Sequence, residues 1–135
     1  MDRLAELNDN MLPFAKLLGI NFVIAELDHV VAKLLIRDDL CNRRDIAHGG
    51  VLMAFADTLG AMGTIINLPD GTSTTTIESK TNFLGAVPMG TCLVGEAAPV
   101  HRGKTTMVWQ TRISTQGGKL TALVTQTQFV FATKP

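Results

Sequence analysis

A continuous apolar segment dominates the pattern of hydrophobic and polar positions in this chain. It runs from residue 51 to residue 66 and contains no lysine, arginine or proline. A helix at a protein surface keeps one polar face, so a helix that is apolar all round is expected in the centre of a fold. A membrane-spanning helix needs roughly 20 apolar residues, and this segment is shorter, which favours a buried core helix.

Six further segments have the short, β-branched-rich pattern that is typical of strands. They span residues 20–26, 30–37, 74–84, 91–101, 105–114 and 120–131. Residues 27–29 suit a reversal, residues 85–90 link the third and fourth segments, and Gly117-Gly118 marks a tight hairpin between the last two. We therefore expect the last four segments to form an antiparallel meander. With the buried helix packed against it, the chain is predicted to have an α+β fold whose sheet of five to six strands wraps around one long helix.

The first 18 residues are expected to form short helical pieces. Pro13 is placed to open a short helix and Gly19 is placed to close it. The side chains expected to face the body of the protein are those of Leu12, Phe14, Leu17 and Leu18. We expect this segment to form a lid over one end of the sheet.

Asp57 is the single charged residue within the apolar helix. Burying a carboxylate costs several kcal/mol unless it is paired, hydrogen-bonded or protonated. One explanation is that the helix has an open edge, where Asp57 is solvated or bonds Thr58 or a neighbouring strand. The other explanation is that Asp57 is a catalytic carboxylate tuned by its environment.

A His48-Gly49-Gly50 turn leads into the apolar helix. The first amides of a helix lack intrahelical partners and form an anion site, and glycine lets the backbone approach a ligand closely. Such amides can stabilise a developing oxyanion, with Gly49 as the leading candidate. Helix entry alone also explains glycine at this position. Histidine is a common general base in enzymes, so His48 could act as one.

The spacing of Gly49 and Asp57 constrains any joint role. Eight residues along one helix, at about 1.5 Å per residue, place them roughly 12 Å apart. One acyl carbon cannot contact both residues of the same chain. If the two act together, a second copy related by a two-fold axis must bring its Gly49 to this Asp57. This predicts an obligate dimer with its sites at the interface.

Length and composition narrow the possible functions. A chain of 135 residues is expected to form one domain, residues 1–135. Twelve basic residues balance twelve acidic ones, so the net charge gives no reason to expect nucleic acid or an anionic membrane as a partner. Cys41, Cys92 and the three scattered histidines lack metal-ligand spacing. No export signal is visible, and with only two thiols this predicts a cytoplasmic protein.

Three features occur together in a specific order: the HGG turn, the acid eight residues after its first glycine, and the later segment TTTIESKTNFLGAVPMG. In this combination the chain, from about Pro13 to Phe131, resembles the hotdog-fold thioesterases. It is most similar to the phenylacetate-pathway-like (PaaI-type) branch of the 4-hydroxybenzoyl-CoA thioesterase superfamily. The resemblance implies hydrolysis of acyl-CoA thioesters, with CoA as part of the substrate and no separate cofactor. It also implies a homotetramer made of two dimers.

The resemblance also implies catalytic or supporting roles for individual residues. Gly49 would supply the oxyanion amide, and Asp57 would be the nucleophile or the general base. His48 would mainly shape the turn. Asn42 falls where some members place an asparagine that holds the thioester or the attacking water.

A further polar residue is expected from the strand after the helix. Thr75 or Thr76 is near the position where some relatives place a serine or threonine that positions the water, although threonine is also an ordinary strand residue. Some members carry a serine or threonine one turn after the acid, where this chain has Ala61. Any polar group that assists the carboxylate must therefore come from Thr58 or from the strand.

Three cations are candidates for contacts with the phosphates of CoA. Arg102 and Lys104 flank a glycine where the family often has Gly-Arg or Gly-Lys near the CoA nucleotide. Arg43 lies in the polar loop before the HGG turn, and its guanidinium suits phosphate oxygens. Solvated cations at turns are the common alternative.

Two other functions remain open at this point. Hotdog hydratases use an aspartate and a histidine five positions later, but Asp45 and His48 are three apart and Met62 follows Asp57 at that distance. A hydratase therefore ranks below a thioesterase. The third possibility is a non-catalytic acyl-CoA-binding module, which the presence of Asp57 disfavours.

Overall fold

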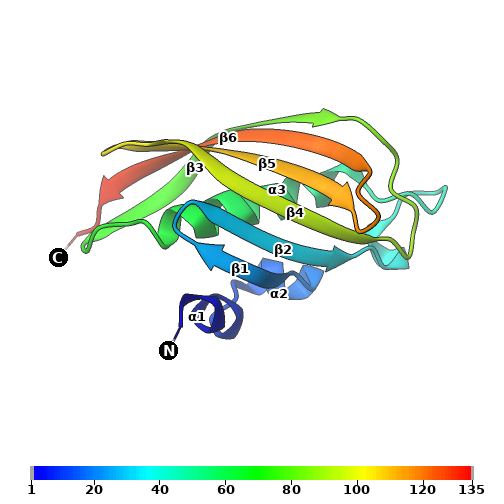
Figure 1. Ribbon diagram of the computed structural model, residues 1–135, viewed down its shortest axis with the longest axis horizontal. Coiled ribbons are helices and arrows are strands. Elements are labelled where there is room, and N and C mark those ends of the chain that lie inside the picture. The colour runs from blue at the N-terminus through cyan, green and yellow to red at the C-terminus, as the bar shows by residue number, and fades with distance from the viewer. Residues whose placement is uncertain (1, 135) are drawn as a thin grey trace.

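The computed structural model describes residues 2–134, in which a six-stranded antiparallel sheet curls around one long helix (Figure 1). The helices are α1 (Arg3–Asp9), α2 (Pro13–Leu18), the 3-10 helix η1 (Asp38–Leu40) and α3 (Gly49–Ile65). The strands are β1 (Asn21–Glu26), β2 (His29–Leu35), β3 (Thr72–Phe83), β4 (Cys92–Arg102), β5 (Thr106–Thr115) and β6 (Leu120–Ala132). The predicted α+β architecture is confirmed.

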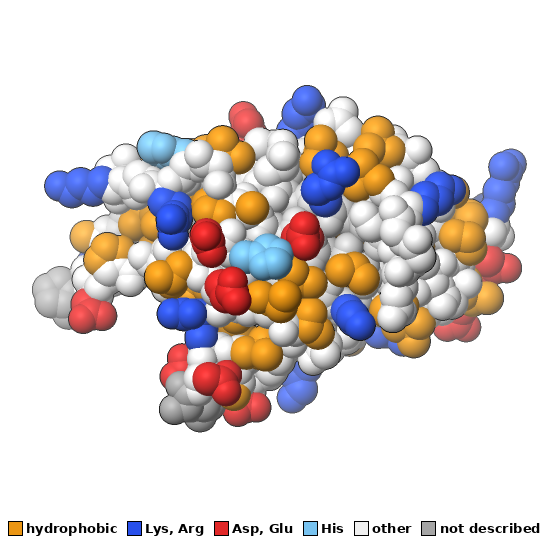
Figure 2. Space-filling view, in the orientation of Figure 1, with side chains coloured by type: hydrophobic (Ala, Val, Ile, Leu, Met, Phe, Trp, Pro, Cys, Tyr) orange, Lys and Arg blue, Asp and Glu red, His pale blue; other side chains and the backbone are white. Residues whose placement is uncertain are grey.

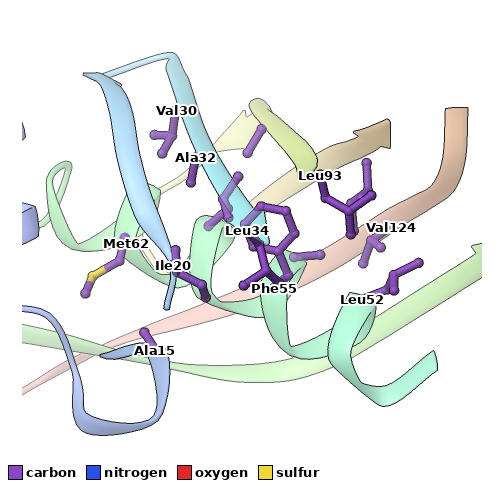
Figure 3. Packing of buried hydrophobic residues seen from close by; sticks show 14 of the residues in the cluster. Ala15, Ile20, Val30, Ala32, Leu34, Leu52, Phe55, Met62, Leu93 and Val124 are labelled. Carbon is purple, nitrogen blue, oxygen red and sulfur yellow. The ribbon is translucent and has the colours of Figure 1, made fainter. Parts of the chain in front are cut away.

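The apolar segment forms α3, which begins two residues earlier than predicted because Gly49 and Gly50 are already helical. Its buried face packs against the concave side of the sheet. Figure 3 shows Leu52 and Phe55 of α3 in one cluster with Leu34, Leu93 and Val124 from three strands. Within the described residues, no helix is long and apolar enough to cross a bilayer.

A glycine on α3 lets the helix approach the sheet closely at Trp109. The Trp109 side chain is fully buried on β5, and a Cβ built on Gly63 would lie 2.7 Å from its ring. Real Cβ atoms do not approach another heavy atom this closely, so only glycine fits here without a shift of the helix or the indole. The glycine therefore sets the distance between helix and sheet.

The strand order is β1-β2-β4-β5-β6-β3. The prediction that the last four strands of the chain form one antiparallel meander is therefore wrong for β3. Only β4, β5 and β6 follow one another as a meander, and β3 lies at the far edge beside β6. The connection after β3 explains this, because it pairs with the loop before α3 instead of turning back. Ala47 N donates to Val87 O at 2.8 Å, and Ile46 forms an isolated bridge with Pro88.

The N-terminal helices also depart from the expectation. Pro13 opens α2 and Gly19 closes it in the left-handed conformation, as predicted. Of the four side chains expected to face the body, only Leu18 is buried, while Leu12, Phe14 and Leu17 are 48%, 57% and 69% exposed. The helix is too short to bury more than one side, and that side is taken by Ala15 and Leu18.

The N-terminal segment covers the edge of the sheet more than its end. The Asn8 side chain of α1 exchanges two hydrogen bonds of 2.9 Å with the backbone of Phe22 in β1. An amide side chain thus takes the place of a neighbouring strand at this point. Such cover protects an edge strand from pairing with other chains.

We predict that Gly63→Ala lowers the free energy of unfolding by about 1–3 kcal/mol, the usual cost of overpacking a well-packed core. The added methyl collides with the Trp109 ring, which outweighs the gain in helix propensity. Urea unfolding followed by Trp109 fluorescence measures the change. Gly117→Ala is the matched control, because its Cβ would meet only Thr115 at 3.8 Å. Equal midpoints for both variants would contradict the prediction.

Candidate active site

The carboxylate of Asp57 lies halfway along α3 and is half-buried against the inner face of β3. Thr76 Oγ1 donates to Asp57 Oδ1 at 2.7 Å. Of the two candidate threonines, Thr76 therefore contacts Asp57, whereas Thr75 is exposed. A β-bulge at Ile77 follows directly, where the register with β6 shifts between Thr76 and Glu78.

The polar group that contacts the Asp57 carboxylate comes from β3, since Ala61 on the helix has no polar side chain. Thr58 Oγ1 donates to Ala54 O at 2.8 Å within the helix, so its hydrogen is not available to the carboxylate. Of the two sources expected from the sequence, the structure therefore shows the strand in contact with Asp57.

Two glutamines of β6 complete the surroundings of the carboxylate, and the sequence analysis missed both. Gln126 Nε2 donates to Asp57 O and Oδ1 at 3.3 and 3.4 Å. Gln128 Nε2 donates to Thr76 Oγ1 at 2.6 Å. Both side chains are fully buried. The sequence pattern that could have revealed them is the alternation of inward-facing and outward-facing residues along β6. Gln126 and Gln128 continue the inward-facing positions of Ala122 and Val124.

Several buried polar atoms near this network have no hydrogen-bond partner among the described residues. They include Gln126 Oε1, Ser79 Oγ and Thr81 Oγ1. Ser79 is the register partner of Gln126, and Thr81 is that of Val124, so the hydroxyls follow Thr76 along β3. Buried polar groups normally have a partner, so these three atoms depart from the usual pattern.

The start of α3 provides a free amide. His48 caps the helix, because its Nδ1 accepts from Gly50 N at 2.8 Å and its carbonyl accepts from Val51 N at 2.9 Å. This geometry requires Nδ1 to be unprotonated, and it matches the turn-shaping role expected for His48. The Gly49 N–H has no acceptor among residues 2–134. It is therefore available to an anion or a carbonyl oxygen.

An apolar groove of about 430 Å³ adjoins Gly49. Its walls come from the segment before α3 and from the connection after β3, and the lining residues are Ile46, Ala47, Gly49, Leu52, Phe83, Leu84, Gly85, Ala86 and Val87. Phe83 and Leu84 are more than half exposed, so the groove is open on one side. A Cβ on Gly49 would lie 3.1 Å from the Phe83 ring, which leaves little space for a larger residue.

The other predicted residues lie away from Asp57 in a single chain. Asn42 is exposed, and its Oδ1 accepts from Arg44 N at 3.1 Å in the loop before α3. Arg43 is exposed in the same loop. Arg102 bonds Asn67 Oδ1 at 3.3 Å just beyond the other end of α3, and Lys104 is exposed in the β4–β5 turn. Their predicted roles toward the thioester or CoA stay predictions.

No single sign of charge dominates the surface that Figure 2 shows, where acidic, basic and hydrophobic side chains are interspersed. Within residues 2–134, no three His, Cys, Asp or Glu side chains form a group that could hold a metal ion.

Burial and the carboxylates of Asp45, Asp38 and Asp39 raise the pKa of the Cys41 thiol. This thiol is therefore a poor nucleophile. The carboxylate of Asp57 and the amide of Gly49 are groups of the kind suited to acyl chemistry.

A sheet curled around a helix that carries a carboxylate in its middle and a free amide at its start defines the hotdog class of thioester-processing proteins. The profile of the thioesterase superfamily matches residues 45–122, which is more than half of the chain. The chain belongs to this family, and the predicted resemblance and fold class are confirmed.

Solved structures support the same assignment. The thioesterase HI1161 of Haemophilus influenzae is 26% identical, with a TM-score of 0.90 over 98% of this chain and 92% of that one. The Escherichia coli PaaI protein of the phenylacetic acid degradation operon is 24% identical, with a TM-score of 0.87 over 98% and 94%. A hypothetical thioesterase of Streptococcus pneumoniae, solved with coenzyme A, is 27% identical, with a TM-score of 0.78 over 86% and 88%. The chain is a thioester hydrolase of the thioesterase superfamily.

We predict that His48→Ala lowers the free energy of unfolding by about 1 kcal/mol, because the helix loses its N-cap. His48→Asn should restore most of this loss, since asparagine is a good N-cap residue. The same His48→Asn variant should keep its thioesterase rate if the imidazole only shapes the turn. A folded His48→Asn protein without turnover would show instead that the imidazole takes part in the reaction.

Proposed function

We propose that this thioester hydrolase acts on acyl-CoA at a site that two copies of the chain share. The observation that carries the proposal is the position of Asp57 on an uncovered stripe of α3. Met53 and Ile65 on this stripe are 40% and 42% exposed, whereas Phe55 and Leu59 on the opposite side are fully buried. The small residues Gly50, Ala54 and Ala61 belong to the same stripe, and none of them is buried. Small residues allow a second helix to approach closely.

The edge of the sheet supports the same arrangement. β3, whose Thr76 bonds Asp57, is an edge strand of 12 residues with a free side. A free strand edge is a ready site for another chain. A two-fold contact across β3 and the α3 stripe would cover both surfaces and bring Gly49 of one copy to Asp57 of the other. We further propose that two such dimers form a homotetramer.

The reaction then follows from the two groups. The thioester carbonyl oxygen accepts from the Gly49 amide of one copy, which stabilises the negative charge of the tetrahedral intermediate. Asp57 of the other copy either attacks the acyl carbon or removes a proton from a water that attacks it. The C–S bond breaks, CoA leaves as the thiolate and takes up a proton, and water supplies the oxygen of the carboxylic acid. Both routes remain compatible with the geometry.

The cations and Asn42 fit this arrangement as further proposals. Antiparallel helices would bring the loop of one copy that carries Asn42 and Arg43 toward the end of the partner helix near Arg102. A CoA nucleotide there would meet guanidinium groups from both chains, with Lys104 close by in the β4–β5 turn. The S. pneumoniae protein solved with coenzyme A supports a CoA substrate. The free thiols Cys41 and Cys92 suit a reducing cytoplasm.

We predict that Asp57→Asn abolishes turnover without loss of fold, because an amide is neither a nucleophile nor a base here. Thiol release from phenylacetyl-, benzoyl-, hexanoyl-, decanoyl- and palmitoyl-CoA measures the rate and identifies the acyl group. Near-native activity of Asp57→Asn would overturn the assignment. A wild-type protein that binds acyl-CoA and leaves all five intact would indicate a non-catalytic binding module.

We predict that Gly49→Pro lowers kcat by about 10²–10³-fold, the usual cost of one oxyanion donor. Proline removes the N–H yet suits the first position of a helix, and His48 already has the extended backbone that precedes proline. Gly49→Ala is the matched control, because it adds a Cβ beside Phe83 but keeps the N–H. Equal losses in the two variants would point to crowding instead of a lost donor.

The same variants test the shared site. A mixed dimer of Asp57→Asn and Gly49→Pro chains has one intact site, since its working Asp57 and Gly49 come from different copies. Co-expression with two affinity tags should therefore recover up to about half of the wild-type rate from two inactive parents. An inactive mixed dimer, or an active monomer in sedimentation, would refute the shared site.

A further inference from the structure

We infer that Gln128 and Gln126 are positioning residues that hold Asp57 by one oxygen, Oδ1, and so leave Oδ2 for the reaction. The hydrogen bonds to Oδ1 come from Thr76 and Gln126. Oδ2 accepts none from the described residues, and Asp57 lies on the uncovered stripe. The consequence for the rate rests on the proposed function, whereas the hydrogen-bonded arrangement does not.

The direction of the hydrogen bonds fixes how Gln128 is oriented. A threonine hydroxyl has a single hydrogen, and Thr76 gives it to Asp57 Oδ1 at 2.7 Å. The group facing Thr76 Oγ1 must therefore be a donor, which is the Nε2 of Gln128 at 2.6 Å. On its other side, Gln128 Oε1 and the Phe129 carbonyl oxygen both lie 3.0 Å from Thr74 Oγ1, so the two oxygens share the single hydrogen of that hydroxyl. The donors run in one direction, from Gln128 through Thr76 to the carboxylate.

Both glutamine side chains are held in place by the packing around them, because neither has any exposed surface. The carboxamide of Gln126 sits against Gly60, where any Cβ would overlap it. The glycine thus opens the space through which Gln126 reaches Asp57. Gln128 is the register partner of Thr76 on the neighbouring strand, so the sheet itself sets their separation.

A fixed Oδ1 matters because the terminal torsion of aspartate is broad and lets the carboxylate rotate. Two donors on the same oxygen restrict that rotation and define the direction of Oδ2. Reactions between held groups depend steeply on such geometry, and a misplacement of about 1 Å can cost about 10²-fold in rate. The donors belong to β3 and β6, whereas the carboxylate belongs to α3, so the sheet sets the direction of Oδ2 relative to the helix.

The first test compares Gln128→Met and Gln128→Glu with the wild-type protein on its best acyl-CoA. Methionine keeps the size but removes the donor, and glutamate offers an acceptor that draws the Thr76 hydrogen away from Asp57. We expect kcat to fall about 10–100-fold in both variants, with KM within about twofold. Thr76→Val should show the same loss, and Thr76→Ser should restore most of the rate. Gln110→Met, on the exposed face of β5, is the matched control and should keep both constants.

The second test observes the network without any turnover. In ¹⁵N–¹H spectra of side-chain amides, Thr76→Val should move the Gln128 resonances and speed their exchange with solvent, while the Gln110 resonances stay in place. Unchanged Gln128 resonances would overturn the inference. Full kcat in a folded Gln128→Met protein would overturn it as well and leave the proposed function intact. If wild-type protein hydrolyses no acyl-CoA, the proposed function fails, and the spectra alone decide whether Gln128 holds Thr76.

Discussion

The carboxylate of Asp57 is half-buried between α3 and β3, so its inward side has to find hydrogen-bond donors on the sheet. Much of the local structure follows from that constraint. Thr76 faces inward to donate to it, two buried glutamines on β6 support Thr76 and the carboxylate, and Gly60 gives Gln126 the space to reach α3. The β-bulge after Thr76 then changes which residues of β3 face the helix. Taking part of a charged group out of water is costly unless donors are arranged around it in this way.

The curled sheet divides α3 into a closed face and an open one. The closed face carries Phe55 and Leu59, which are fully buried and hold the helix against the strands. The open face carries Asp57 together with small residues, and it lies beside the free edge of β3. Stability is thus supplied by one side of the helix, and the sheet leaves the other side uncovered. The free Gly49 amide, at the start of the same helix, is too far from Asp57 for both to serve one acyl carbon within a chain.

The sequence was sufficient for features that depend on local pattern. The apolar run located α3 to within two residues, the strand segments were close to those observed, and the HGG turn located the helix start. The pairing of β3 with β6 was not predictable in this way, because it depends on where the connection at residues 84–91 leads. Its contacts with the loop before α3 are long-range and leave no local signal.

The site was predicted unevenly for the same reason. Asp57 stood out because a charge in an apolar run needs an explanation. The choice between Thr75 and Thr76 required the strand register, and the exposure of Phe14 and Leu17 required knowing which side of α2 meets the sheet. Gln126 and Gln128 did leave a signal, since two amides interrupt the inward-facing apolar positions of β6.

The buried glutamines are better explained by the carboxylate than by folding. A buried amide contributes little net stability even when bonded, and Gln126 Oε1 has no partner among the described residues. An apolar side chain of similar size at either position would spare the cost of removing an amide from water. Asp57 itself adds a larger cost of the same kind. The donors on β6 and the acid on α3 therefore make sense together, because each polar group is expensive alone and the network gives the carboxylate one defined orientation at the open face of the helix.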